Sequence, residues 1–473
     1  MDWIIFFAVL CYLIYEAEKK RFKFGASKAS PETKVLKPAK ILPETAVKEQ
    51  SLKLSQEQLK VFNYLESSFK HTFITGKAGS GKSALLNYFK TNTKKRVIVL
   101  APTGIAALNI GGQTIHSFFK IRPGVAEATN IRLNQETIEI LKHVDALIID
   151  EISMVRADLI DALDGYLRQV RNAQSAFGGI QLIMFGDLYQ LPPIMNDQAL
   201  YSYFKLRYGG YFFFNARVWQ KTELVTYELK KIFRQTGNKF KDILNSVRCG
   251  HVDEQLLNEL NQRAKAKLPD SGVITLGATN KIIEDINQQK LADISGREFI
   301  YEADIEGKIG RNEYLIEKTL KLKVGAQVMM IKNDKDKRWV NGSLGQVIRL
   351  SLQEVIVRIN GNDHVVPKCT WSKVKYNFDQ ATGRIRESSI SQITQFPLRL
   401  AWAMTIHKSQ GQTYASCAID LKDGVFAHGQ AYVALSRCKS LSGLYLLSPI
   451  LASDISVDPQ VTGFMDRAEL LSI

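Results

Sequence analysis

The chain has few cysteines, and their spacing argues against a cysteine-based framework. Five occur in 473 residues, far apart and odd in number, and no two form a C-x-x-C pair. This pattern argues against disulfide cross-links and against a zinc site, and it indicates a reducing compartment. The cysteines are Cys11, Cys249, Cys369, Cys417 and Cys438.

The apolar run at the amino terminus lacks the length of an ordinary membrane-spanning helix. Residues 3–15 are uncharged and apolar, but as a helix they extend only about 20 Å, against ~30 Å for the hydrocarbon core of a bilayer. Lysines and an arginine follow at positions 19, 20, 21 and 23, the reverse of the charge order in a signal peptide. By the positive-inside rule this order would leave the rest of the chain on the cytosolic side. Three interpretations stay open: a marginal membrane anchor, a helix docked on protein, and a targeting segment.

Acidic residues are in deficit. Lysine and arginine number 63 against 47 acidic residues, which gives a formal net charge of +16 and a pI near 9.4. This balance favours a polyanionic partner such as nucleic acid or an anionic membrane, although a solubilising surface would give the same figure. The composition is otherwise globular, with 45% hydrophobic and 23% charged residues, and the length suggests two large domains or several smaller ones.

Short apolar runs, each ended by a polar turn, recur in the first half of the chain. They span residues 71–75, 97–100, 146–149 and 181–185. Such runs, separated by amphipathic stretches, predict a parallel sheet with crossover helices and with ligands at the carboxyl ends of its strands.

The chain from about residue 219 has a similar pattern of apolar runs and amphipathic stretches. A later part shows the apolar/polar alternation of β-strands, with turn signals between them. The sequence therefore predicts an α/β fold with several parts. They are a hydrophobic segment with a basic flank at 1–23, a linker at 24–51, a first domain at 52–217, a second domain at 218–322 and 399–473, and a small barrel-like β insertion at 323–398.

Residues 76–83 match the phosphate-binding pattern G-x-x-x-x-G-K-[ST] in full. The motif follows a predicted strand and opens a predicted helix, and its glycines let backbone N–H groups wrap a phosphate chain. Lys82 is expected to reach the β- and γ-phosphates and Ser83 to ligate Mg²⁺, so the predicted cofactors are ATP and Mg²⁺. The residues of this predicted nucleotide site are Gly76, Lys77, Ala78, Gly79, Ser80, Gly81, Lys82 and Ser83.

A carboxylate pair follows the apolar run at 146–149. Asp150 is expected to hold Mg²⁺ through water, and Glu151 to orient and deprotonate the attacking water. Acidic residues at such a place can also cap a helix, so the prediction depends on the phosphate motif that precedes the pair. Gln190, after the next run, is expected to sense the γ-phosphate or its water. A glutamate in the second position favours hydrolysis and argues against a kinase.

These motifs, in this order, resemble those of superfamily 1 DNA helicases of the petite-integration-frequency (PIF) and RecD-like type, from about residue 52 to residue 447. The resemblance implies two RecA-like P-loop domains with parallel sheets, a small β-barrel-like insertion in the second domain, and ATP in the cleft between them. Residues 54–58 resemble the family's glutamine motif, in which Gln58, or else Gln56, would read adenine. Ser55 as N-cap with Gln58 at N3 is also a capping box, so both interpretations stay open.

The resemblance also implies two arginine fingers from the second domain. Residues 233–235 and 432–437 resemble the motifs that supply them, as Arg234 and Arg437. A planar guanidinium that reached across the cleft would stabilise charge on the γ-phosphoryl group. A surface salt bridge is the alternative for each. The predicted catalytic residues are Lys82, Asp150, Glu151, Gln190, Arg234 and Arg437.

Several loops resemble the family's DNA contacts. Residues 101–118 offer hydroxyls, backbone amides and an aromatic ring, which suit a phosphate–sugar track with base stacking. Residues 405–413 resemble the loop that couples nucleotide state to DNA grip. Residues 278–280 and 340–342 also match family patterns: the first is expected to be a DNA or hinge contact, and the second also suits a simple hairpin turn. Core or structural roles are the alternative for Phe118 and the histidines. The predicted DNA contacts are Thr103, His116, Ser117, Phe118, Thr279, Asn280, His407, Lys408, Ser409 and Thr413.

Together these features predict an ATP-dependent DNA helicase or translocase that acts as a monomer on single-stranded DNA and on forked or tailed duplex. Only the resemblance implies 5′-to-3′ movement and roles in DNA repair, recombination, replication and telomere maintenance. A translocase or protein-displacing ATPase with little unwinding, and a nucleic-acid-binding module that has lost catalysis, are the alternatives. We expect an intracellular compartment that contains DNA (nucleus, mitochondrion, or bacterial or virus-infected cytoplasm), with membrane contact through residues 3–15 left open.

Overall fold

The computed structural model describes residues 54–468, except residues 123, 196, 308–315, 380–381, 383 and 423. The predictions for residues 1–23 and 24–51 lie outside this part of the chain. Among the described residues, no helix is both long enough and apolar enough to cross a membrane.

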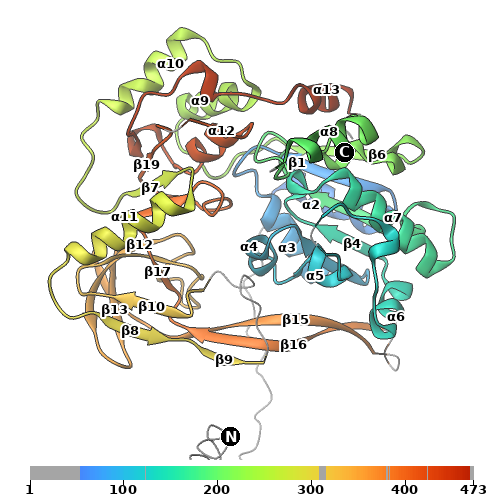
Figure 1. Cartoon of the computed structure of the whole chain (residues 1–473), viewed down its shortest axis with the longest axis horizontal. Helices are drawn as coiled ribbons and strands as arrows, with labels where there is room; N and C mark the ends of the chain where they lie inside the picture. The colour runs from blue at the N-terminus through green and yellow to red at the C-terminus, as the bar shows by residue number, and fades with distance from the viewer. Residues whose placement is uncertain are drawn as a thin grey trace, which may run out of the picture. The chain divides into compact units, whose positions relative to one another are not determined.

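A parallel sheet of six strands forms the centre of the first lobe (Figure 1). The four strands predicted from apolar runs are confirmed, and every residue of β4 and β5 is buried. In spatial order the strands are β3 (Gln113–Thr114), β2 (Val97–Ala101), β4 (Ala146–Ile149), β5 (Gln181–Phe185), β1 (His71–Gly76) and β6 (Leu224–Leu229).

Two hydrophobic clusters cover the two faces of this sheet. Successive side chains of a strand point to opposite faces, so Leu147 and Ile149 of β4 join one cluster, whereas Ala146 and Ile148 join the other. Burial on both faces explains why these strands are continuous apolar runs. The helices of the lobe are α2 (Gln56–Ser67), α3 (Lys82–Asn92), α4 (Gly104–Asn109), α5 (Ile115–Phe119), α6 (Gln135–His143), α7 (Ala157–Arg171) and α8 (Gln198–Tyr208).

The first lobe extends past residue 217, where its end was predicted. Strand β6 pairs with β1 along its whole length, from His71 opposite Leu224 to Gly76 opposite Leu229. The sequence of an apolar strand does not indicate which sheet the strand joins, and the prediction placed the residues from 218 onward in the second domain. The pairing corrects that boundary to a position after β6.

A second parallel sheet, of four strands, forms the second lobe. Its strands are β18 (Ala403–Thr405), β7 (Ile274–Gly277), β19 (Cys417–Ile419) and β20 (Leu444–Leu446), in spatial order. Its helices are α9 (Asn238–Cys249), α10 (Glu254–Asn261), α11 (Asn280–Asp293) and α12 (Gln430–Leu435). Two lobes with parallel sheets match the predicted fold class.

The last described helix, α13 (Pro459–Arg467), packs on the first lobe instead of the second. The ring of Phe464 stacks on Phe214 with centroids 4.3 Å apart, and Val461 belongs to the hydrophobic cluster of the first sheet. The prediction placed residues 399–473 wholly in the second domain. The chain therefore returns to its first lobe at its end, which ties the two lobes together.

The β insertion is larger than predicted. A five-stranded antiparallel sheet, a two-stranded sheet and a three-stranded sheet make it up, and its strands begin at residue 299 instead of 323. The five strands are β14 (Asn362–Val366), β13 (Val355–Ile359), β12 (Leu344–Leu350), β11 (Gln327–Met330) and β17 (Leu398–Leu400). The others are β8 (Phe299–Glu302), β10 (Thr319–Leu322), β9 (Asp304–Glu306), β15 (Cys369–Asp379) and β16 (Arg384–Gln395).

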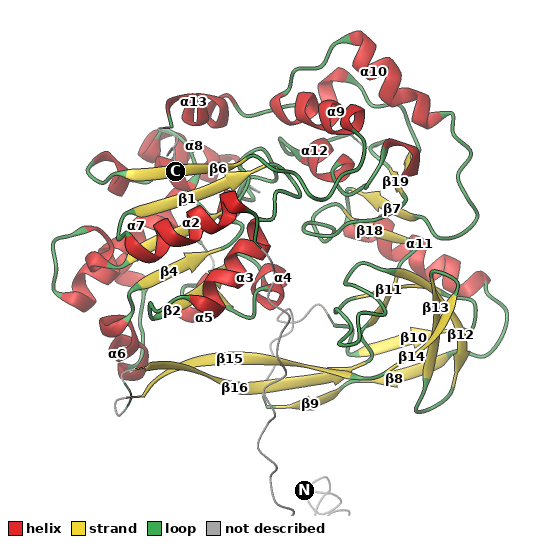
Figure 2. Cartoon of the chain, turned by 180° about the vertical axis from the view of Figure 1, so that it is seen from behind, coloured by secondary structure: helices red, strands yellow, loops and turns green. Residues whose placement is uncertain are grey.

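The long hairpin of β15 and β16 leaves the insertion and reaches the first lobe, as Figure 2 shows beneath α6. The buried hydroxyl of Tyr376 lies 3.3 Å from both the N–H and the carbonyl oxygen of Val99 on β2. The insertion therefore contacts both lobes, which its place in the sequence did not indicate.

Candidate active site between the two lobes

The phosphate-binding loop has the predicted strand–turn–helix form. It leaves β1 at Gly76 and enters α3 at Lys82, and Gly79 and Gly81 have positive φ angles of 82° and 84°. A Cβ at Gly79 would stand 2.3 Å from the Cβ of Arg234, so a side chain there is excluded by space as well as by conformation. The loop is therefore in direct contact with the second lobe.

Lys82 lies inside the loop. Its Nζ donates to the carbonyl oxygens of Gly76 at 2.5 Å and Lys77 at 3.3 Å. Burial lowers the pKa of Lys82, and the nearby carboxylates of Asp187 and Glu151 oppose that shift. The direct partners of Lys82 Nζ are thus neutral carbonyl oxygens, and a bound phosphate chain would give it a negatively charged partner.

The carboxylate pair follows β4 at the carboxyl edge of the first sheet, as predicted. Burial, together with the charge of Glu151, raises the pKa of Asp150 to about 7. Burial also raises the pKa of Glu151, although Lys82 and Arg437 pull it down. The backbone of Glu151 has φ 50°, a left-handed conformation that residues other than glycine rarely adopt. In this conformation the Glu151 side chain contacts Gln410 of the second lobe.

Gln410 of the second lobe joins two of the predicted catalytic residues. Its Nε2 donates to Glu151 Oε2 at 3.1 Å and approaches Gln190 Oε1 at 3.5 Å. Gln190 in turn donates to Asp187 Oδ2 at 3.3 Å. Gln410 lies in the predicted loop 405–413, but it was not singled out because nothing distinguished it there from its polar neighbours.

Both predicted arginine fingers face the phosphate-binding loop across a shared cavity of about 460 Å³. Arg234 Nη2 donates to the carbonyl oxygen of Gly411 at 3.0 Å, and burial together with the charge of Arg437 lowers the pKa of Arg234 to about 9. Arg437 is 1% exposed and donates to Val433 O and Ser436 Oγ, each at 2.8 Å. The predicted residues that line the cavity are Ala78, Gly79, Ser80, Gly81, Lys82, Ser83, Glu151, Gln190, Arg234, Thr413 and Arg437.

Gln58 forms the capping box that the sequence allowed. Its side chain accepts from Ser55 N–H at 3.0 Å, and its Nε2 donates to the carbonyl oxygen of Gly81 at 3.1 Å. The amide thus holds the phosphate-binding loop, and both of its ends are engaged. Adenine recognition by Gln58 stays a prediction, and the alternative, Gln56, is exposed.

The predicted DNA contacts of the first lobe separate into accessible and buried residues. Thr103 is the N-cap of α4, and His116 and Ser117 are half-buried on α5. Phe118 is 5% exposed and packs with Phe119 and with Tyr376 of the long hairpin. Phe118 therefore belongs to the core, the alternative that the sequence left open, and presents no ring for base stacking here.

The second lobe shows the same division. Thr279 and Asn280 are exposed at the start of α11, and His407 and Lys408 are half-buried. Ser409 is fully buried, and its hydroxyl donates to the carbonyl oxygen of Ile406 at 2.7 Å. Its hydroxyl is thus committed to the loop's own backbone, which corrects its predicted role as a phosphate donor in this conformation.

Comparison with known proteins agrees with this geometry. A family model described as PIF1-like helicase matches residues 53–257, and one described as DNA helicase Pif1, 2B domain, matches residues 311–350. The ATP-dependent DNA helicase Pif1 of Bdellovibrio bacteriovorus is 35% identical over 428 residues, which cover 88% of this chain and 93% of that protein. The chain belongs to the Pif1-like helicase family. It spans less than two thirds of the length of the zebrafish, yeast and human relatives.

Two solved Pif1 structures from Bacteroides differ in how well they fit. The complex with ADP-AlF4 superposes with a TM-score of 0.81, at 38% identity, over 88% of this chain and 97% of that one. The structure bound to single-stranded DNA superposes with a TM-score of only 0.64 at the same identity and coverage. Because identity and coverage are equal, the difference lies in conformation. The conformation of this chain is therefore closer to that of the ADP-AlF4 complex than to that of the complex with single-stranded DNA.

A cavity of about 410 Å³ lies where the first lobe, the insertion and the loop 405–413 meet. It is lined by Asn109 of α4, by Lys408, and by Trp371 of β15. Lys332 lies over the Trp371 ring at 5.1 Å and donates to the carbonyl oxygen of Thr370. The sequence analysis did not single out Trp371, because a lone tryptophan in a strand usually packs in a core. Its place in this cavity depends on where the hairpin lies, which the sequence does not indicate.

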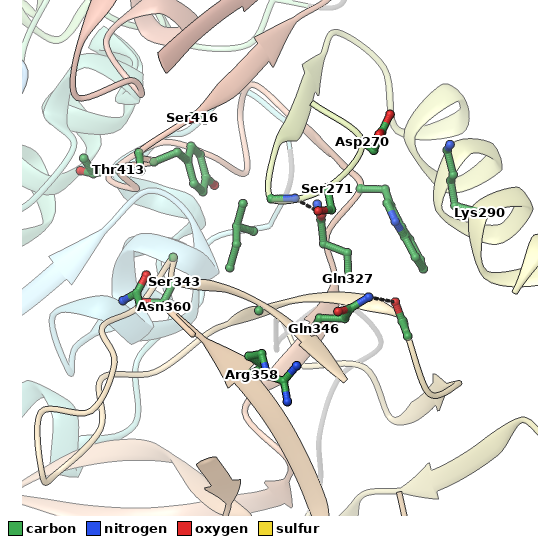
Figure 3. A pocket seen from close by; sticks show the side chains of 18 of the residues that line it. Asp270, Ser271, Lys290, Gln327, Ser343, Gln346, Arg358, Asn360, Thr413 and Ser416 are labelled. Carbon is green, nitrogen blue, oxygen red and sulfur yellow. Dashed lines mark hydrogen bonds between the residues drawn. The ribbon is translucent and has the colours of Figure 1, made fainter. Parts of the chain in front are cut away.

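Figure 3 shows another cavity, of about 680 Å³, between the second lobe and the insertion. Gln327 crosses its wall: it accepts from Gly272 N–H at 2.9 Å and donates to Val273 O and Ala401 O. Thr413 lines this cavity and the nucleotide cavity alike. Thr413 therefore lies between the two cavities, and because it is half-buried its contact with DNA stays a prediction.

Proposed function

We propose that the chain hydrolyses ATP between its two lobes and uses the energy to move 5′-to-3′ along single-stranded DNA and to separate duplex. It is an ATP-dependent DNA helicase of the Pif1 type. The observation that carries the proposal is that Lys82, Glu151, Arg234 and Arg437 line one cavity although two lobes supply them.

The hydrolysis step follows from the position of each group. The loop amides and Lys82 would hold the phosphates, and Glu151 would accept the proton of the attacking water. Arg234 and Arg437 would stabilise charge on the departing γ-phosphoryl group. Gln410 donates to Glu151 and approaches Gln190, and the two glutamines would together fix the position of that water.

The donor set suits Mg²⁺, which takes one or two protein oxygen ligands besides waters and substrate phosphates. Ser83 is an exposed residue that lines the nucleotide cavity, and Asp150 is a buried carboxylate beside Glu151. Burial and the adjacent charge raise the pKa of Asp150 to about 7, and a cation would offset both effects. Mg²⁺ bound here would neutralise charge on the phosphates.

The arginine contacts suggest how nucleotide state reaches the DNA. Arg234 donates to Gly411 O, and Arg437 donates to Ser409 O at 3.4 Å and Gln412 O at 3.2 Å. All three carbonyls lie in the loop predicted to grip DNA. A γ-phosphate that drew both guanidinium groups away would release this loop, so binding and hydrolysis would alternate its grip.

The cavity lined by Trp371 and Lys408 is the proposed DNA path between the lobes. A cationic wall and an aromatic face suit single-stranded DNA, whose phosphates bind lysines and whose bases stack. Arg399 and the amides of Asn109, Asn333 and Asn341 line the same space. Thr103 and Thr279 follow β2 and β7, one in each lobe, and extend this path as proposed phosphate contacts.

One experiment tests the proposal and separates it from a translocase with little unwinding. ATP turnover and strand separation are measured on duplexes with a 5′ tail, a 3′ tail or a fork, with Lys82→Ala as the inactive control. We expect DNA-stimulated turnover on every tailed substrate and strand separation only with a 5′ tail or a fork. Turnover that ignored DNA would refute the motor, and stimulated turnover without separation would favour the translocase. The family's roles in repair, recombination, replication and telomere maintenance, in a compartment that contains DNA, would follow from unwinding.

A further inference from the structure

A buried polar network joins the phosphate-binding loop to the second lobe, and Gln190 contacts it by donating to Asp187 Oδ2 at 3.3 Å. The backbone N–H of Ala78 donates to the hydroxyl oxygen of Tyr432, on α12, at 2.9 Å. That hydroxyl donates to Asp187 Oδ2 of the first lobe at 3.4 Å. Arg248, on α9 of the second lobe, donates to Asp187 Oδ1 from Nη2 at 3.0 Å and from Nε at 3.3 Å.

Every member of this network is shielded from water. Asp187 is fully buried, and Tyr432, Arg248 and Ala78 are each 5% exposed or less. In such a setting an unpaired N–H or carboxylate is costly, so the four groups depend on one another. Burial raises the pKa of the Tyr432 hydroxyl, which keeps it protonated and able both to donate and to accept.

The backbone around the network is equally close. A Cβ at Gly429, which precedes α12, would stand 2.3 Å from the carbonyl oxygen of Tyr189. The guanidinium of Arg248 lies 4.2 Å from the centre of the Tyr189 ring. The start of α12 therefore packs directly on the loop that follows β5. This contact fixes the position of the Tyr432 hydroxyl relative to the backbone N–H of Ala78.

Charge gives Arg248 a second role. The carboxylate of Asp187 is near enough to Lys82 to favour the charged lysine, so it is also near the place of a bound triphosphate. Burial opposes the ionisation of Asp187, but the charges of Arg248 and Lys82 outweigh it and hold the pKa of that carboxyl below its usual range. Without Arg248, a negative charge would face the nucleotide from inside the protein.

We infer that Tyr432, Arg248 and Asp187 are positioning residues through which the second lobe holds the phosphate-binding loop ready for nucleotide. This inference rests on the proposed function of the cavity. It differs from the arginine-finger role, because it acts on nucleotide affinity through the loop and not on the reacting γ-phosphoryl group. The loop of the first lobe is thus shaped by contact with the second.

The test measures binding of a fluorescent ADP, with Mg²⁺ and without DNA, to the full chain. We expect Tyr432→Phe to weaken binding about tenfold, because the buried N–H of Ala78 loses its acceptor. The matched control is Tyr445→Phe, on β20 of the same lobe, whose ring packs against Arg263 away from the cavity. The control should bind like the parent. Equal binding by Tyr432→Phe and the parent, or equal losses in both variants, would overturn the inference.

A double substitution tests the electrostatic part. Arg248→Gln should weaken ADP binding at least tenfold, and Asp187→Asn together with Arg248→Gln should recover most of that loss, because the unpaired negative charge is gone. A merely structural pair would show no such recovery in affinity, and that result would contradict the role of Arg248. The readout is ADP binding, so a parent that bound ADP but failed to unwind DNA would refute the proposed function alone.

Discussion

Glu151 sits in a left-handed backbone conformation, with φ 50°, between the strand that carries it and the second lobe. For a residue with a side chain this conformation costs about 1–2 kcal/mol, and such strain collects at active sites. In this conformation the Glu151 carboxylate accepts a hydrogen bond from Gln410, which offsets part of that cost. The position of the proposed base therefore depends on a left-handed backbone conformation at Glu151. The acidic pair in the sequence does not indicate this conformation.

Glu151→Gln keeps the shape of this side chain and removes its ability to take a proton. We expect the DNA-stimulated turnover number to fall at least about 100-fold, since general base catalysis contributes about 10² to 10⁴ in rate. Binding of fluorescent ADP should stay within threefold of the parent. The matched control is Glu139→Gln on α6, a half-buried glutamate that pairs with Lys142 and His143. Turnover within fivefold of the parent would exclude Glu151 as the base.

The residues of the candidate nucleotide cavity could be proposed from sequence because their motifs are short and local. Lys82, Glu151 and the two arginines lie where the motifs placed them. Gln410 and Tyr432 could not be singled out, since their roles depend on partners 259 and 354 positions away along the chain. Ser409 differs: its hydroxyl donates to Ile406 O, only three positions away, in a turn that the polar composition of the loop does not reveal.

At the scale of elements, strands were easy to predict and their partners were not. The apolar runs predicted β1, β2, β4 and β5, but β6 pairs with β1 in the first sheet although the sequence analysis placed its residues in the second domain. The hairpin of β15 and β16 looked like part of a compact insertion, yet its Tyr376 is buried against β2 and Phe118. This contact buries the aromatic ring predicted to stack on DNA and brings Trp371 to the cavity instead.

Trp371→Ala tests that exchange of roles. We expect it to weaken binding of a single-stranded oligonucleotide about tenfold, since base–aromatic stacking is worth about 1–3 kcal/mol, and Trp371→Phe should retain most of the affinity. Fluorescence anisotropy of a labelled oligonucleotide gives both values, and ADP binding serves as the internal control. Unchanged DNA affinity in Trp371→Ala would remove this residue from the proposed path.

At the scale of the whole molecule, the net charge of +16 supplies the long-range attraction that a motor on DNA needs. If about five phosphates are held by cationic side chains, the logarithm of the affinity for single-stranded DNA should fall with the logarithm of salt concentration at a slope of about −3.5. Anisotropy titrations between low and physiological salt measure this slope. A slope shallower than −1 would mean that the charge serves solubility and not DNA binding.

The central claim is that each lobe supplies half of the hydrolytic machinery, and turnover of the arginine variants tests it most directly. Arg234→Ala and Arg437→Lys should each lower DNA-stimulated turnover about 1000-fold or more, with ADP affinity and thermal midpoint close to the parent's. Lysine is used at Arg437 because this buried side chain also bonds Val433 and Ser436. If both variants turned over ATP within fivefold of the parent, catalysis would not depend on the second lobe and the account would be contradicted.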